Sequence, residues 1–358
     1  GAYRWERFDL IVLPPSFPFG GMEHPRLTFA TPTILAGDRS LTSLVAHELA
    51  HSWSGNLVTN LTWDDFWLNE GFTVYFERRI MEALYGKDYA DMLAILGYQD
   101  VTHTVAELSK THPDDTHLKL DLKGRNPDDG LTDIAYEKGY FFLRMLEEQV
   151  GRESFDAFLK AYFNDNAFKS MDTEGFVEHL QTALLGGDAE RLAALKVKDW
   201  IYGPGIPDNC PEVPSVRFEQ VQAALDGWNN GQAAGELNTA EWSTHEWLYF
   251  LRGLPESLET AKLTELDEAF GFTQSGNSEV LAAWFQNTIR NNYSAADGAV
   301  EQFLIDVGRR KFLTPTYQAL IEADSTKERA RAIYAKARPG YHAVSYNTMD
   351  ALLDWETN

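Results

Sequence analysis

The sequence is poor in cysteine, in basic residues and in long apolar runs. Cys210 is the only cysteine among 358 residues, so no disulfide can form within the chain. Lysine and arginine number 31 against 54 aspartates and glutamates, and the formal net charge of −23 argues against nucleic acid and anionic membranes as partners. No apolar run approaches the roughly 20 residues that a membrane-spanning helix needs, so we expect no membrane span.

What the sequence does have is a set of metal-binding side chains at helical spacing. His47, Glu48 and His51 stand in the string His-Glu-Leu-Ala-His, inside a stretch from 40 to 54 that is expected to be helical. Two histidines four residues apart lie on one face of a helix and can bind one ion, while Glu48 points to the side. The spacing therefore predicts a metal site at His47 and His51.

A third protein ligand is needed, because a hydrolytic zinc site combines three protein ligands with one open position for water. Glu70 supplies it from a second predicted helix, in the string Trp-Leu-Asn-Glu-Gly, nineteen residues after His51. Bound zinc lowers the pKa of its water towards about 7, and Glu48 is placed to accept the proton as general base. We predict one Zn²⁺ per chain, held by His47, His51 and Glu70.

The alternative is an ordinary core helix whose two histidines are satisfied by carboxylates. A His-Glu-x-x-His string is by itself only a moderate signal. The second string strengthens it, because an Asn-Glu-Gly sequence at this distance, on a segment that reads as a buried helix, is hard to obtain by accident. The two strings together favour the metal site.

Five motifs in the same order resemble those of the gluzincin aminopeptidases, and among these the leukotriene A4 hydrolase and aminopeptidase group. The motifs occupy residues 17–23, 47–51, 53–56, 67–71 and 136–139. The resemblance implies a zinc aminopeptidase that hydrolyses the N-terminal peptide bond of short peptides with a free N-terminus. It also implies a mainly α fold with a small sheet, in which a thermolysin-like α+β zinc peptidase domain precedes an all-α HEAT/armadillo-like helical superhelix.

The same resemblance assigns further residues to substrate and chemistry. It implies that a turn binds the substrate, with the last carboxylate holding the free amino terminus; the turn comprises Gly20, Gly21, Met22 and Glu23. Tyr136 is implied to donate a hydrogen bond to the oxyanion that develops in the transition state. The residues alone leave two plainer readings open, a solvated turn glutamate and an aromatic side chain that only packs.

Three more charged residues match substrate-binding positions of the hydrolase group. Asp128 matches an acid that the lipid-hydrolase members use and that also lies near the peptide site. Arg309 and Lys311 match a basic pair that binds the substrate's carboxylate, and an arginine offers a bidentate fork for such a group. Salt bridges to nearby acids are the alternative for this pair.

Other functions remain alternatives. Epoxide hydrolysis on a lipid would use the same zinc site with Asp128 guiding water, but Leu131 stands where close relatives have a second tyrosine, which disfavours it. An interaction scaffold with an inactive peptidase domain is disfavoured because the three ligands, the base and Tyr136 are all present. An endopeptidase is disfavoured by Glu23.

Proline and glycine mark the predicted domain boundary. We expect a catalytic domain at 1–203, a Pro-rich linker at 204–216 and an α-helical solenoid at 217–358, with strands of a small sheet at 3–13 and 27–35. Helices are expected at 40–54, 64–85, 89–109, 136–150, 153–163 and 172–185, and then at 218–228, 241–251, 259–270, 279–291, 297–309, 315–323 and 327–337.

The family normally has a β-rich domain ahead of the part that this sequence resembles. We therefore expect that an N-terminal β-rich domain is missing from this chain. The expected location is cytoplasmic. Secretion and a periplasmic location stay open, because targeting signals could have been lost with the missing part.

Overall fold

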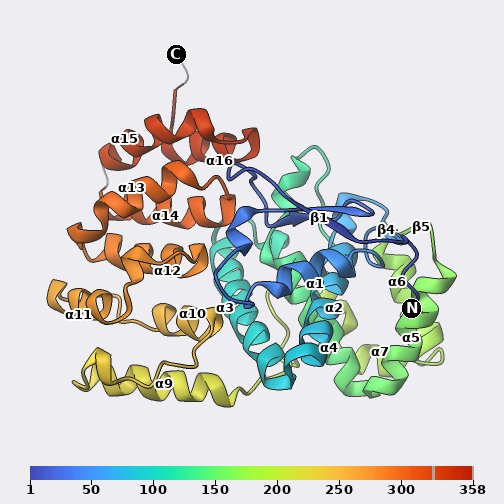
Figure 1. Ribbon diagram of the computed structural model, residues 1–358. Coiled ribbons are helices and arrows are strands. Elements are labelled where there is room, and N and C mark those ends of the chain that lie inside the picture. The colour runs from blue at the N-terminus through green and yellow to red at the C-terminus, as the bar shows by residue number, and fades with distance from the viewer. Residues whose placement is uncertain (325–326, 357–358) are drawn as a thin grey trace. The chain divides into compact units, whose positions relative to one another are not determined.

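The computed structural model describes residues 1–324 and 327–356, and it consists mostly of helices with a few short strands (Figure 1). This confirms the prediction of a mainly α fold with a small sheet. The chain divides into two compact units: the first comprises Gly1–Asp9, Glu23–Leu27 and Val45–Ser215, and the second comprises Leu10–Met22, Thr28–Leu44 and Val216–Asn358. The sequence pattern did not indicate that early segments group with the C-terminal helices, and the expected domain bounds stay a prediction.

The first unit is organised around the helix α2 (Trp67–Tyr85), which packs against α3 (Lys87–Thr111) and α4 (Gly139–Val150). Gly86 and Gly151, with φ of 91° and 87°, end α2 and α4 in a conformation that other residues rarely adopt. The remaining elements are α1 (Thr42–Ala50, of which Val45–Ala50 belongs here), β4 (Val58–Asn60), α5 (Arg152–Asp165), β5 (Lys169–Met171), α6 (Thr173–His179), α7 (Ala189–Ala194) and α8 (Val197–Tyr202). β4 and β5 pair in parallel.

Aromatic side chains form the core of this unit beside α2. Trp67 and Phe176 meet edge to face with ring centroids 5.4 Å apart, and Phe72 stacks on Tyr162 at 5.6 Å. Each of these four side chains is at most 2% exposed. Burying large aromatic side chains in edge-to-face and stacked pairs gives strong and directional packing. This packing fixes the first turn of α2, which carries Glu70.

Two glycines bring this turn close to the start of α4. A Cβ atom added at Gly139 would lie 2.8 Å from the Cα of Gly71, and one added at Gly71 would lie 2.9 Å from the Cα of Gly139. The helices therefore touch backbone to backbone at this point. Just before Gly139, residues Ile134–Lys138 form a π-helical turn (η5), where the apolar pattern had predicted an ordinary α-helix beginning at Tyr136. Glu70 and the turn that carries Tyr136 are in this way held next to each other.

Among the described residues after Ser215, eight α-helices follow one another along the chain and stack in two layers, shown from yellow to red in Figure 1. Helices α9, α10, α12, α14 and α16 contact one another in turn, and α13 packs on α15. The bounds are α9 (Val216–Asn229), α10 (Thr244–Arg252), α11 (Thr260–Phe270), α12 (Ser278–Arg290), α13 (Asp297–Asp306), α14 (Arg310–Ala323), α15 (Glu328–Ala337) and α16 (Ala343–Leu353). Such stacking confirms the predicted helical superhelix.

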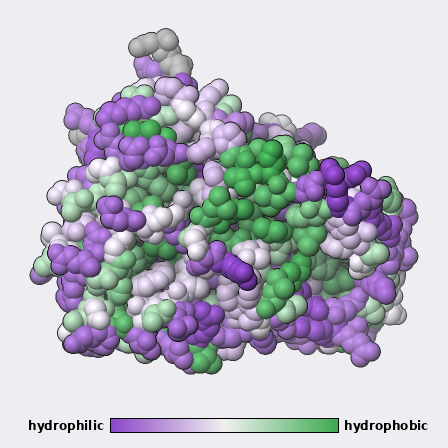
Figure 2. All heavy atoms as spheres, viewed as in Figure 1, coloured by the Kyte–Doolittle hydropathy of each residue, from purple (hydrophilic) through white to green (hydrophobic). Residues whose placement is uncertain are grey.

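A three-stranded sheet in the order β1-β3-β2 lies mostly in residues of the second unit. Its strands are β1 (Asp9–Val12), β2 (Gly21–Met22) and β3 (Leu27–Ala30), and β2 pairs antiparallel with β3 so that Gly21 faces Ala30. The visible face in Figure 2 is largely hydrophilic, with an apolar area in the region where Figure 1 shows β1. Ile11 and Val12 of this strand are each 43% exposed.

Some elements differ from the sequence prediction for identifiable reasons. α14 begins at Arg310, so that Pro315 lies inside the helix instead of at its start. A proline this close to the N-terminus removes only one hydrogen bond, the one to the carbonyl of Lys311, and the helix continues through it. The short helices α7 and α8 and the strands β4 and β5 were missed, because short elements have too few residues for a clear period. The sequence prediction also missed α16. Within the described residues, no helix is both long and apolar enough to span a bilayer.

The glycine contact leads to a stability prediction. Gly139→Ala should lower the free energy of unfolding by about 1–3 kcal/mol, because the new methyl group overlaps the backbone of α2. The matched control is Gly298→Ala in α13, where a Cβ meets nothing within 4 Å and alanine favours the helix. Denaturant unfolding of both variants measures the difference. Equal stability of the two variants would contradict the close contact.

Candidate active site

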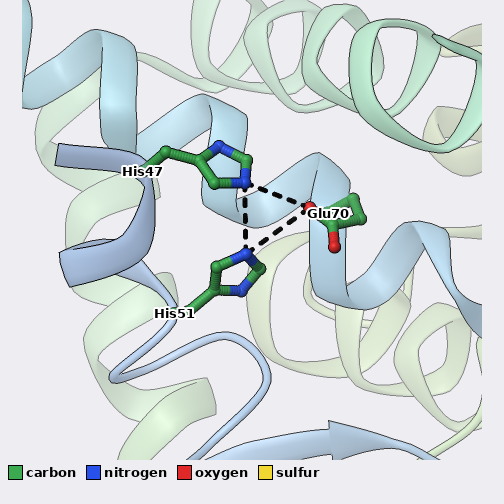
Figure 3. A group of neighbouring side chains, drawn as sticks. All are labelled: His47, His51 and Glu70. Atoms are coloured by element: carbon green, nitrogen blue, oxygen red, sulfur yellow. Dashed lines mark hydrogen bonds and ion pairs between the residues drawn. The ribbon is translucent and has the colours of Figure 1, made fainter. Parts of the chain in front are cut away.

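Three side chains converge on one point in the first unit (Figure 3). His47 belongs to α1, His51 follows directly after the last residue of α1, and Glu70 lies in the first turn of α2. The two Nε2 atoms lie 3.1 Å apart, and Oε2 of Glu70 is 3.3 Å from Nε2 of His47 and 3.5 Å from Nε2 of His51. The structure thus brings together the three ligands that the sequence predicted.

The donor set and its spacing fit a zinc ion. Ligand atoms about 2.0–2.1 Å from a tetrahedral zinc are roughly 3.3 Å from one another, and the three separations fall around this value. Two imidazoles and one carboxylate leave a fourth position open, as in hydrolytic zinc sites. Among the described residues, Oε2 of Glu70 and Oε2 of Glu48 are buried without a hydrogen-bond partner, and a nearby cation would satisfy both.

The other ring nitrogens of the two histidines are held by hydrogen-bonding groups. Nδ1 of His47 lies 3.1 Å from Oε2 of Glu77, and Nδ1 of His51 lies 2.9 Å from the carbonyl oxygen of Ser54 and 3.0 Å from Oγ1 of Thr73. A proton on each Nδ1 leaves each Nε2 with its lone pair directed at the metal position. The sequence reasoning missed Glu77. Its spacing of seven residues from Glu70, two helical turns along the same face of α2, was the available signal.

Glu48 lies beside the ligand cluster in a nearly dry position. Its side chain and those of Glu23 and His51 place a ligand atom each within 4.8 Å of one another, and Glu48 is only 5% exposed. Burial raises the pKa of Glu48 to about 7, against the opposing effect of His47 and His51. A carboxylate with such a pKa can both take up and release a proton near neutral pH.

Glu23 lies in the same cluster of ionisable side chains and stays anionic. Burial raises its pKa, but the charge of His51 and hydrogen bonds, one of them from Asn69, outweigh this and lower the pKa overall. Nδ2 of Asn69 donates to Oε1 of Glu23 over 3.3 Å, and Nδ2 of Asn56 donates to its backbone carbonyl over 2.7 Å. These contacts fix an ionised carboxylate next to the metal ligands.

Tyr136 lies on the π-helical turn Ile134–Lys138. Its ring is nearly parallel to the imidazole of His47, at an angle of 15° with centroids 6.2 Å apart. Burial raises the pKa of Tyr136 well above its ordinary value, and the negative charges of Glu70, Glu23 and Glu48 raise it further. The phenol therefore keeps its proton and can act as a neutral hydrogen-bond donor.

The remaining predicted substrate residues lie elsewhere. Gly20, Gly21 and Met22 belong to the second unit, as do Arg309 and Lys311. A Cβ at Gly20 would lie 2.7 Å from Nη2 of Arg309, so glycine permits this close approach. The basic pair is bound to an acid of the same unit.

Glu279 is the acid between the two cations. Nζ of Lys311 donates to its carboxylate over 2.8 and 2.9 Å, Nη1 of Arg309 lies 3.5 Å from it, and Arg309 also donates to Oγ1 of Thr33 over 3.2 Å. The salt-bridge alternative for the pair is thus realised, and its role towards substrate stays a prediction. Asp128 is exposed in the 3₁₀ turn Pro127–Gly130, and within the described residues no ion pair joins it to the metal ligands.

Comparison with known proteins agrees with this geometry. Residues 1–200 match the peptidase family M1 domain, and residues 242–353 match the C-terminal domain of leukotriene A4 hydrolase. The chain belongs to peptidase family M1. The M1 chain is 36% identical to leucine aminopeptidase 2 of Yarrowia lipolytica over 96% of its own length and 55% of that protein. It is 36% identical to a leukotriene A-4 hydrolase homolog of Botryotinia fuckeliana, over 96% of the chain and 53% of the relative.

A solved structure shares the fold of this M1 chain. The structure of yeast LTA4 hydrolase in complex with bestatin superposes with a TM-score of 0.85 and 31% identity, covering 99% of this chain and 60% of that one. The likeness confirms the predicted order of a peptidase domain and a helical domain. The chain spans about half the length of the curated relatives that it matches.

The Glu77 contact leads to a prediction for metal binding. Glu77→Ala should weaken zinc binding by about 10- to 100-fold. The substitution removes the acceptor for the proton on Nδ1 of His47, so that the imidazole ring is no longer held in its orientation. Competition with a chelator of known affinity measures the change. Glu82→Ala is the matched control, since Glu82 lies on the same helix but pairs with Arg152. Equal zinc affinity in Glu77→Ala and the control would contradict the orienting role.

Proposed function

We propose that this chain is a zinc-dependent aminopeptidase that hydrolyses the N-terminal peptide bond of short peptides. The observation that carries the proposal is the placement of the Glu23 and Glu48 carboxylates within 4.8 Å of a ligand atom of His51. This short distance places a proton acceptor, Glu48, and an anionic group that can bind an ammonium, Glu23, beside the metal position. Membership of family M1 supports the same reaction.

The residues divide the chemistry among them. Zinc, when held by His47, His51 and Glu70 at one ion per chain, polarises a carbonyl and lowers the pKa of water. Glu48 accepts the proton of the attacking water, and its raised pKa of about 7 lets it pass this proton on to the leaving amine. Because the site is buried, the proton transfer takes place away from bulk water.

Tyr136 acts on the carbonyl group of the peptide's first residue, and Glu23 acts on its amino group. The phenol of Tyr136 donates a hydrogen bond to the carbonyl oxygen as it gains negative charge, an interaction that is stronger in the transition state than in the ground state. The carboxylate of Glu23 binds the ammonium of the peptide's first residue. That contact fixes the substrate so that only the first peptide bond reaches the metal position.

The proposal extends to the residues of the second unit. Gly20, Gly21 and Met22 would bind the substrate through a strand backbone, and Arg309 and Lys311 would bind its carboxylate. The two cations share one acid, Glu279, so the trio has a surplus of one positive charge. Lys311 is 52% exposed in its side chain and can reach a second anion. Asp128 is proposed as a further contact to the substrate. We also propose a cytoplasmic location, which cell fractionation would test.

Epoxide hydrolysis on a lipid is the alternative, favoured by the names of the related hydrolases. Leu131 lies partly buried against the core of the first unit, where a hydrocarbon side chain offers no hydrogen bond to an epoxide oxygen. Turnover of a fatty epoxide would decide in its favour.

The base assignment gives a direct prediction. Glu48→Gln should retain zinc and lower kcat about 100- to 10,000-fold, because the amide cannot accept the proton. Metal analysis of the purified variant provides the control for an intact site. A variant with full zinc and the wild-type rate would refute the role of Glu48.

Glu23 gives a prediction for substrate choice. Glu23→Ala should reduce kcat/KM for free-amine peptides by a factor equivalent to at least about 2 kcal/mol, since the ammonium loses its counter-ion. Peptides with an acetylated N-terminus should be poor substrates before and after the change. Glu6→Ala is the matched control, because Glu6 is an exposed acid of the same unit. If blocked peptides were cleaved as well as free ones, the enzyme would be an endopeptidase.

A further inference from the structure

The turn that carries Tyr136 continues with two charged residues, of which Glu137 is partly buried and Lys138 is buried. The side chain of Glu137 is 14% exposed, and Lys138 is fully buried. Buried charges cost several kcal/mol unless they are paired or bonded to polar groups, so their partners identify what the turn is bound to.

Glu137 is bound by an arginine from α2. Nη2 of Arg78 donates to both carboxylate oxygens of Glu137, over 2.8 and 2.6 Å, and also to the carbonyl oxygen of Leu93 over 3.2 Å. The guanidinium lies over the ring of Tyr140, 3.9 Å from its centroid. Arg78 is only 6% exposed. The arginine thus joins α2, α3 and the turn that carries Tyr136.

The chain leaves room for this ion pair. Gly97 in the middle of α3 has no side chain, and a Cβ there would overlap both the carboxylate of Glu137 and the guanidinium of Arg78. Lys138 holds the other side of the turn, since its Nζ donates to the carbonyl oxygens of Thr116 over 2.7 Å and Gly203 over 2.9 Å. The turn is therefore bound on both sides, while the ring of Tyr136 lies against that of the metal-site residue His47.

Consecutive residues of α2 serve the two halves of the site. Glu77 lies against the ring of His47, and Arg78 binds Glu137, which is next to Tyr136 in sequence. One turn of α2 thereby orients both the metal ligand and the tyrosine that stacks on it. A displacement of about 1 Å in a reacting group can lower a rate about 100-fold, so such a connection matters to chemistry.

We propose that Arg78 and Glu137 are positioning residues, whose ion pair through Nη2 of Arg78 keeps the phenol of Tyr136 directed at the reacting carbonyl. The inference rests on the proposed function, because it needs Tyr136 to act in the transition state. It concerns the placement of Tyr136 and involves no direct contact of the pair with substrate.

The test uses two variants of the pair and one control. Glu137→Gln removes the charge of the acid, and Arg78→Lys keeps the positive charge but removes the guanidinium that donates to Glu137 and Leu93 and lies over the ring of Tyr140. Both should lower kcat about 10- to 100-fold with KM changed less than about threefold and with full zinc content. Asp156→Asn is the control, because it breaks the neighbouring bidentate pair of α2, Arg79 with Asp156, and should leave kcat unchanged. Wild-type kcat in both pair variants would overturn the proposal.

A double-mutant cycle with Tyr136→Phe separates positioning from general loss of structure. If the pair acts through Tyr136, Glu137→Gln should lower kcat little further in the Tyr136→Phe background. Losses that multiply in the double variant would show that the pair acts independently of Tyr136 and would overturn the inference.

Hydrogen exchange of a peptide spanning residues 132–140 gives a readout that does not depend on activity. Exchange should be faster in Glu137→Gln and unchanged in Asp156→Asn, because only the first change frees the π-helical turn. Unchanged exchange in Glu137→Gln would overturn the inference even if kcat falls. Normal kcat in Tyr136→Phe, together with faster exchange in Glu137→Gln, would instead refute the proposed role of Tyr136.

Discussion

The site depends on keeping several polar atoms close together in a buried place. The ligand atoms of His47, His51 and Glu70 lie 3.1–3.5 Å apart, where lone pairs repel one another unless a cation or a proton lies between them. Without support, the side chains would separate and take up water. The support comes from α2, whose first turn is fixed by aromatic packing and by the contact of Gly71 with Gly139.

The charge around this point explains which ligands suit it. Glu23, Glu48, Glu70 and Glu77 all lie at or beside the two histidines, in a chain whose net charge is already −23. A divalent metal and the ammonium of a peptide each offset part of this negative charge. The low pKa of Glu23 and the raised pKa of Glu48 divide the carboxylates into one that binds a cation and one that exchanges a proton.

How much the sequence could predict depended on how local each feature was. The pair His47 and His51 follows from a spacing of four on one helix, and Glu70 from a second motif nearby, so the metal ligands could be found without a structure. The contacts of Glu77 with His47 and of Arg78 with Glu137 join residues 30 and 59 positions apart, and no periodic pattern encodes them. The π-helical turn was missed because its apolar spacing does not differ enough from that of an α-helix. The grouping of early segments with the C-terminal helices depends on tertiary contacts for the same reason.

The division of the chain into interleaved units has a consequence for attempts to dissect the molecule. The backbone passes from one unit to the other five times, after Asp9, Met22, Leu27, Leu44 and Ser215. Neither unit is therefore a contiguous stretch of sequence. A cut at the proline-rich segment would give a C-terminal fragment without Leu10–Met22 and Thr28–Leu44, and an N-terminal fragment carrying those segments without the helices with which they group. Neither fragment would contain all the segments of one unit, so we expect that neither half would fold into a complete unit when expressed alone.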